Sequence, residues 1–290
     1  MDIGIIGIGL MGHAFVERFL SQGFKVRIFN RSPEKVRDLA DKGALVCPSA
    51  DELIERSDII ILMLSDADAI NDILQLETLD SSGLKSKTIL QMATISPSQS
   101  RHIAESVSSC GGRYLEAPVL GSIPEARTGT LIIMAGGSSE VYETVLPVLN
   151  VLGSAPRYIG KTGAAAALKL AMNQLIASLT AGFSLSLGYA LKNGVDTDLF
   201  MDTVRESALY AKTYDKKLDK YLSRDFGAAN FSTRHLLKDI RLFIEDAKAT
   251  GLNTDALQGI ERITSKTVDS GMALLDYSSI YQVINPDQKP

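Results

Sequence analysis

The sequence predicts an α/β protein with a doubly wound parallel sheet domain, then an all-helical domain, joined by one long helix. Short apolar runs alternate with helix-like segments up to residue 162, which is typical of a parallel sheet covered by helices. Residues 163–192 contain no proline and are apolar on nearly every side, which predicts a single buried helix. Beyond residue 196 only helical periodicity is present. We therefore expect a first domain at residues 1–162 and a second at 163–290.

The expected strands of the first domain are short, and helix-like segments separate most of them. They are residues 2–6, 25–30, 44–46, 58–64, 88–92, 113–119, 129–135 and 156–159. The helices expected there are 13–22, 33–42, 49–56, one that begins at Pro97 behind the capping residue Ser96, and 139–149. The second domain should contain the long helix and further helices at 197–207, 214–222, 232–250, 255–269 and 277–284.

The composition narrows the classes of function. A chain of 290 residues is long enough for two domains with separate cores, and 45% hydrophobic with 22% charged residues is ordinary for a soluble protein. A net charge of −4 without a long basic run argues against nucleic acid or an anionic membrane as partner. Two cysteines without a spacing motif, and a start without a basic secretion signal, lead us to expect a cytoplasmic protein. The histidines and carboxylates show no ligand spacing, so we predict no metal.

A glycine-rich turn, Gly7-Ile8-Gly9-Leu10-Met11-Gly12, follows the first expected strand and precedes a helix. Gly7 permits a tight turn, Gly9 lets the backbone approach a pyrophosphate, and Gly12 allows helix and strand to pack closely. The helix start offers N–H groups and a positive dipole end to the phosphates. The arrangement predicts a Rossmann-type dinucleotide-binding domain.

The end of the second expected strand bears on which dinucleotide is bound. A site that prefers NAD usually has Asp or Glu there for the ribose hydroxyls, whereas this chain has Asn30-Arg31-Ser32. An arginine with hydrogen-bonding neighbours suits a 2′-phosphate. We therefore favour NADP(H) over NAD(H).

Two further segments should face the cofactor crevice, because they follow strands of the predicted parallel sheet. Leu64 and Ser65 lie at the end of the strand 58–64, and Thr94 lies in the loop after the strand 88–92. The hydroxyl of Thr94 is a candidate for the nicotinamide side, with simple turn chemistry as the alternative.

Lys169 is the one charge inside the long apolar helix before its terminal Lys192. A buried lysine is costly unless it has a role, and Asn173 lies four residues on, where helical spacing directs both side chains to the same side. Earlier in the chain, Gly121-Ser122 offers backbone N–H groups and a hydroxyl to an anion such as a carboxylate. Other loop functions remain open for this pair.

In order along the chain, four patches resemble the β-hydroxyacid dehydrogenase family, most closely its glyoxylate/succinic semialdehyde reductases and 3-hydroxyisobutyrate dehydrogenases. The patches are Gly7–Gly12 with the methionine typical of the family, Glu116–Ser122 with Gly129-Thr130-Leu131, Gly160–Gly163 with Lys169 and Asn173, and Lys238-Asp239. The resemblance implies that the second patch binds substrate, that Lys169 and Asn173 are catalytic, and that Lys238 reaches the cofactor. The chain departs from the family at Leu120, where serine is usual, at Met172, and at Gln91 and Ala93.

The resemblance implies hydride transfer between NADP(H) and a small aldehyde-acid or the corresponding β- or γ-hydroxyacid. Lys169 would donate a proton to the developing alkoxide, and burial would bring the pKa of such a lysine closer to neutral. Asn173 would orient the substrate or Lys169, and Ser122 would hold the carboxylate.

Two alternatives stay open: an imine reductase on the same scaffold, against which Lys169 argues, and a non-catalytic dinucleotide-binding module. The apolar helix also suggests a homo-oligomer, either dimer or tetramer. A membrane span is less favoured, because the helix carries several polar side chains and stands alone in a charged chain.

Overall fold

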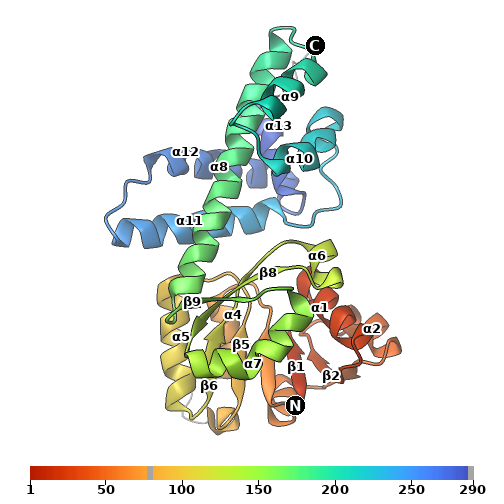
Figure 1. The fold of residues 1–290 in the computed structure, drawn as a ribbon, viewed down its shortest axis with the longest axis vertical. Coiled ribbons are helices and arrows are strands. Elements are labelled where there is room, and N and C mark those ends of the chain that lie inside the picture. The colour runs from red at the N-terminus through yellow and green to blue at the C-terminus, as the bar shows by residue number, and fades with distance from the viewer. Residues whose placement is uncertain (77–80, 287–290) are drawn as a thin grey trace. The chain divides into compact units, whose positions relative to one another are not determined.

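The computed structural model describes residues 1–76 and 81–286. It contains two compact units, Met1–Lys169 and Leu170–Pro290. The division falls inside the long helix α8 (Ala164–Lys192), a few residues beyond the domain boundary expected after residue 162. Figure 1 shows the chain coloured by residue number, from red at the N-terminus to blue at the C-terminus.

The first unit is built on one sheet with the strand order β3-β2-β1-β4-β5-β6-β8-β7, and β9 pairs with β8. The strands are β1 (Ile3–Ile6), β2 (Val26–Phe29), β3 (Leu45–Val46), β4 (Ile59–Leu62), β5 (Thr88–Gln91), β6 (Arg113–Glu116), β7 (Val119–Leu120), β8 (Ile132–Gly137) and β9 (Arg157–Gly160). Strands β1 to β6 pair in parallel, with β1 between β2 and β4. The strand order reverses at β1, which is where ligands bind in open α/β sheets.

The helices of this unit include two that the sequence analysis did not identify. They are α1 (Leu10–Ser21), α2 (Arg37–Asp41), α3 (Ala50–Glu55), α4 (Ala67–Leu74), α5 (Pro97–Ser109), α6 (Ile123–Thr128) and α7 (Ser139–Leu152), with 3₁₀ turns η1 (Pro33–Val36) and η2 (Ser81–Leu84). Helices α4 and α6 are the two that were missed. Each has a capping residue before it, Asp66 and Ser122 respectively.

Several expected elements have different bounds in the structure. The helix expected at residues 33–42 is η1 followed by the short α2. The strand expected at 113–119 is divided into β6 and β7, because Pro118 has no N–H to donate to a neighbouring strand. The strand expected at 129–135 begins only at Ile132, where β8 pairs antiparallel with β7.

Two hydrophobic cores cover the two faces of the sheet. One joins β1 to α1, α6 and α7 through residues such as Phe15, Ala126 and Val145. The other joins the opposite face to α3, α4 and α5 through residues such as Leu53 and Ile70. Because β1 is buried along its whole length, the turn that follows it is held from both faces.

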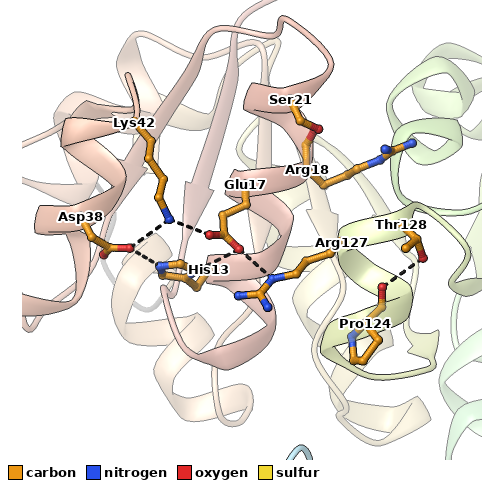
Figure 2. A network of polar contacts seen from close by, with 9 residues as sticks. All are labelled: His13, Glu17, Arg18, Ser21, Asp38, Lys42, Pro124, Arg127 and Thr128. Atoms are coloured by element: carbon orange, nitrogen blue, oxygen red, sulfur yellow. Dashed lines mark hydrogen bonds and ion pairs between the residues drawn. The ribbon is translucent and has the colours of Figure 1, made fainter.

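A cluster of charged side chains joins α1, α2 and α6 on the surface of this unit (Figure 2). Glu17 accepts hydrogen bonds from Lys42 at 2.7 Å and from Arg127 at 2.9 Å. His13 Nε2 lies 2.7 Å from Asp38 Oδ2. The cluster therefore links the helix behind the glycine-rich turn to the two helices beside it.

The second unit is all-helical, as expected. Besides most of α8 it contains α9 (Thr197–Glu206), α10 (Lys212–Ser223), α11 (Thr233–Ala249), α12 (Asp255–Thr267), a π-helical turn η3 (Val268–Met272), a 3₁₀ turn η4 (Tyr277–Ser279) and α13 (Ile280–Ile284). The ring of Phe183 on α8 stacks on that of Tyr214 with centroids 4.3 Å apart. A second cluster packs Ala177 of α8 against Leu236 and Ile240 of α11.

Length and composition alone would allow α8 to cross a membrane, and 44% of its most apolar window is buried within the protein. A core helix of a soluble protein meets the same criteria, so this feature is weak evidence for a membrane span.

Candidate functional site

The glycine-rich turn leaves room for a ligand in front of Gly9. A Cβ on Gly7, whose φ is +97°, would lie 2.4 Å from the carbonyl oxygen of Met63, and one on Gly12 would lie 2.0 Å from that of Gly7. A Cβ on Gly9 would meet no atom within 4 Å. Gly9 caps α1 and has no side chain to accept the first N–H groups of the helix. The turn thus fits a pyrophosphate, which would approach the backbone at Gly9.

The side chain of Asn30 connects this turn to the end of β2 through hydrogen bonds. Its Oδ1 accepts the N–H of Ile8 at 2.9 Å, and its Nδ2 donates to the carbonyl oxygen of Ser32 at 3.1 Å. Its side chain therefore organises the turn rather than projecting into open space. Arg31 is exposed and Ser32 half-buried at the same turn, so their side chains remain candidates for the cofactor.

The segments after β4 and β5 lie at the same edge of the sheet as the glycine-rich turn. Leu64 lies close to Gly7, because a Cβ added to Gly7 would be 3.0 Å from Leu64 Cδ2. Ser65 donates to Asp66 Oδ2 at 2.7 Å, and Thr94 is half-buried after the next strand. The fold therefore brings together the glycine-rich turn, Leu64 and the adjacent strand ends, as the parallel order predicts.

The Gly121-Ser122 pair lies directly before α6. Gly121 has a φ of +122°, which favours glycine. The N–H and the hydroxyl of Ser122 both donate to Glu125 Oε2, at 2.8 and 2.7 Å. The donors expected to hold a substrate carboxylate are thus engaged by a carboxylate of the chain itself. The sequence analysis did not consider Glu125, although Ser122 and Glu125 have capping-box spacing.

Lys169 is half-buried in the second turn of α8, within the first unit. The start of this helix is held by Glu116 at the end of β6, whose Oε1 accepts the N–H of Ala165 at 2.8 Å. Glu116 belongs to a patch that the family resemblance singled out, but the sequence offered no reason to pair it with α8.

In the second unit, Asn173 is joined to α11. Its Nδ2 donates to Asp239 Oδ2 at 2.6 Å, and both side chains are buried. Lys238 Nζ lies 3.0 Å from Asp239 Oδ1. The predicted residues Asn173 and Lys238 therefore both contact Asp239. Sequence spacing alone did not indicate that Asp239 lies between them. The Oδ1 of Asn173 is buried and has no hydrogen-bond partner within the described ranges.

Acidic, histidine and cysteine side chains are the usual protein ligands of a metal ion. Over residues 1–76 and 81–286, no group of three or more of them is placed to hold a metal ion.

Comparison with known protein families decides the assignment. Residues 2–160 match the family model of the NAD binding domain of 6-phosphogluconate dehydrogenase, and residues 163–284 match that of the NAD-binding region of NADP-dependent 3-hydroxyisobutyrate dehydrogenase. The chain belongs to the β-hydroxyacid dehydrogenase family. It is therefore an NAD(P)-dependent oxidoreductase of the hydroxyacid dehydrogenase type, and a purely structural dinucleotide-binding module is no longer a suitable alternative.

Individual proteins agree with the family assignment. Glyoxylate/succinic semialdehyde reductase 1 of Arabidopsis thaliana is 30% identical over 289 residues, which is 98% of each chain. The 3-hydroxyisobutyrate dehydrogenase structure from Mycobacterium tuberculosis has a TM-score of 0.87 at 24% identity, covering 98% of each chain. An imine reductase from Myxococcus stipitatus has a TM-score of 0.66 at 20% identity, covering 98% of this chain and 100% of that one. The two structural likenesses confirm the fold, a Rossmann-type domain followed by a helical one.

Proposed function

We propose that the chain reduces a small aldehyde-acid of the glyoxylate or succinic semialdehyde type with NADPH, and oxidises the matching hydroxyacid in reverse. A 3-hydroxyisobutyrate-type substrate belongs to the same proposal. The single observation that carries it is the amide of Asn173. Its Nδ2 donates to Asp239, so its Oδ1 points away from Asp239. This oxygen is buried and has no hydrogen-bond partner within the described ranges. A buried acceptor of this kind is costly unless an incoming group donates to it.

NADPH, when bound, supplies the hydride. The N–H groups at the start of α1 would bind its pyrophosphate, since the space in front of Gly9 is open. Arg31 and Ser32 would bind the 2′-phosphate, and the absence of an acidic residue at this turn favours NADPH over NADH. Leu64, Ser65 and Thr94 would contribute to the remainder of the cofactor site in the first unit, and the family resemblance is what supports a cofactor role for Lys238.

Lys169 would act as the general acid. Its Nζ would donate a proton to the alkoxide oxygen during reduction and accept a proton from the hydroxyl during oxidation. Asn173 lies one helical turn further along α8, and its Oδ1 would accept a hydrogen bond from the hydroxyl of the hydroxyacid or from Nζ of Lys169 and so orient that group. Retention of a lysine at this position supports the hydroxyacid reaction over imine reduction.

Gly121 and Ser122 would bind the carboxylate of the substrate. For Ser122 to do so, the side chain of Glu125 has to release the N–H and hydroxyl that it accepts. Leu120, where the resembling enzymes usually have serine, offers no hydroxyl to compensate. Both features favour substrates whose binding depends little on hydrogen bonds to their carboxylate.

We further propose a homo-oligomer in which α8 of one copy packs against that of another. One side of α8 exposes Leu175, Leu185 and Tyr189, whose relative solvent accessibilities as whole residues are 47%, 63% and 71%. Gly182 lies between them on the same side, and no atom lies within 4 Å of where its Cβ would be. A glycine inside a helix is unfavourable by about 1 kcal/mol relative to alanine. The missing side chain of Gly182 would offset this cost if it allowed a second helix to approach closely.

The test is a panel of glyoxylate, succinic semialdehyde, methylmalonate semialdehyde, tartronate semialdehyde and one cyclic imine, each with NADPH and with NADH. We expect turnover of at least one aldehyde-acid, at a higher kcat/KM with NADPH. Reduction of a cyclic imine without turnover of any aldehyde-acid would contradict the proposal. Sedimentation at micromolar concentration tests the oligomer, and a monomer would contradict that part.

A further inference from the structure

Glu116 is a buried carboxylate that the proposed reaction does not use. Its side chain is 1% exposed at the end of β6. Its Oε1 accepts the backbone N–H groups of Gly163 and Ala165 at 2.8 Å and of Ala166 at 3.2 Å. One oxygen atom from the sheet therefore binds three N–H groups at the beginning of α8.

These three N–H groups would otherwise lack an acceptor. The first N–H groups of a helix have no partner inside the helix, and a side-chain oxygen of the capping residue usually accepts one of them. The residue before α8 is Gly163, which has a φ of +97° and no side chain. Glu116 thus performs from a distant strand the function that a capping residue performs locally.

The carboxylate of Glu116 is confined on its other sides as well. The hydroxyl of Ser100 on α5 donates to Oε2, and the same Ser100 oxygen lies 2.8 Å from the hydroxyl of Tyr114. Across the sheet, Gly136 pairs with Glu116, and a Cβ on Gly136 would lie 2.5 Å from Oε1 and 3.2 Å from the Cβ of Ala165. The side chain is therefore confined between β8, α5 and α8.

We infer that Glu116 is a positioning residue for Lys169. Lys169 follows Ala166 by three residues on the same rigid helix, so a shift of the first turn displaces its ammonium group. This inference rests on the proposed role of Lys169 as general acid. A misplacement of about 1 Å in a catalytic group lowers the rate by about 100-fold.

Two substitutions separate position from charge. In Glu116→Gln the amide oxygen still accepts the N–H groups of α8, and the amide nitrogen is able to donate to the Ser100 hydroxyl. In Glu116→Ala no acceptor remains. Ser57→Ala is the matched control for loss of a buried polar group in the same unit, since its hydroxyl donates to the carbonyl oxygen of Leu53, away from α8.

The experiment compares kcat, KM, NADPH affinity and the solvent deuterium isotope effect on kcat for these variants. We expect Glu116→Ala to lower kcat about 100-fold with a larger isotope effect and unchanged NADPH affinity. Glu116→Gln should restore kcat to within about threefold of the native value. A native kcat in Glu116→Ala, or a Glu116→Gln variant as slow as Glu116→Ala, would overturn the inference.

Hydrogen exchange of the amides at residues 163–169 provides a readout that does not depend on turnover. We expect faster exchange there in Glu116→Ala but not in Glu116→Gln or Ser57→Ala. If Glu116→Ala does not fold, Gly136→Ala displaces the carboxylate while keeping it, and should lower kcat in the same way, with Gly83→Ala as control because a Cβ there meets no atom within 4 Å. Unchanged exchange and kcat in the folded variant would overturn the inference.

The parallel variant Lys169→Met distinguishes the two proposals. Full activity in that variant contradicts the proposed function, whereas its inactivation together with a fully active Glu116→Ala contradicts only the inference.

Discussion

Asn173 on α8 donates a hydrogen bond of 2.6 Å from Nδ2 to Oδ2 of Asp239 on α11, and each of the two side chains is only 3% exposed. Since Asp239 as a carboxylate only accepts hydrogen bonds, it fixes which end of the amide faces it. The amide oxygen of Asn173 is thereby directed away from Asp239. Lys238, 3.0 Å from the other carboxylate oxygen, balances its charge.

Asp239→Asn should destabilise the protein, because a neutral amide replaces the charge-assisted acceptor and no longer fixes the orientation of Asn173. We expect a loss of about 1–3 kcal/mol in the free energy of unfolding, measured by urea denaturation, together with a lower kcat. Glu245→Gln makes the same charge change at an exposed position of α11 and should leave both values unchanged. Equal stability of the two variants would contradict this account of the pair.

Arg31→Ala should weaken the binding of NADPH and leave that of NADH nearly unchanged, because only NADPH carries the 2′-phosphate. The loss of a hydrogen bond to a charged group corresponds to an increase of about 10- to 100-fold in Kd. Fluorescence titration with both dinucleotides measures the effect, and Lys35→Ala at a neighbouring exposed position is the control. An equal loss for both dinucleotides would show that Arg31 does not discriminate between them.

Glu125→Ala should improve the binding of substrates that carry a carboxylate, because it frees the N–H and hydroxyl of Ser122. We expect KM for glyoxylate to fall about tenfold, with an intermediate value for Glu125→Gln. Glycolaldehyde, which has a hydroxymethyl group in place of the carboxylate, should show no change. Thr128→Ala on the same helix controls for loosening of α6, and a similar fall in that variant would argue against competition by Glu125.

Glu17→Gln should lower stability at pH 7 but not in acid. Burial by itself raises the pKa of Glu17, but hydrogen bonds from Lys42 and Arg127 outweigh it and hold the pKa below its usual value. A carboxyl with a lowered folded-state pKa stabilises the protein above its unfolded pKa, and this stability is lost as pH falls through the folded pKa.

We therefore expect native and Glu17→Gln proteins to differ by about 0.5–1 kcal/mol in unfolding free energy at pH 7 and to converge below the carboxyl pKa range. Glu143 is exposed, and Glu143→Gln is the control. Its unfolding free energy should equal that of the native protein at pH 7 and in acid. A difference that persists in acid would indicate that packing rather than charge accounts for the effect.

The parts of the fold that depend on local pattern were predictable from the sequence. Gly7, Gly9 and Gly12 identified the turn after β1, and the apolar run in residues 163–192 identified α8. Helix α6 was missed although its capping spacing was present, because six residues carry too little periodicity.

The parts that depend on distant residues were not predictable. The contact of Glu116 with Ala165 joins positions 49 residues apart, and that of Asn173 with Asp239 joins positions 66 apart. No periodicity or spacing rule encodes such pairs, because they arise only when strands and helices pack. Glu125 differs from these pairs, because it lies three residues from Ser122 and its capping-box spacing was present in the sequence but was overlooked.

The most direct test of the central claim is the single-turnover rate of NADPH oxidation with the best aldehyde-acid of the panel, in native, Lys169→Met and Lys161→Met proteins. Lys161 is the control, because it is an exposed lysine shortly before α8. We predict that Lys169→Met slows the reaction by about 10²- to 10⁴-fold while NADPH affinity is kept, and that Lys161→Met is unaffected. A Lys169→Met protein that binds NADPH and reacts at the native rate would contradict the account.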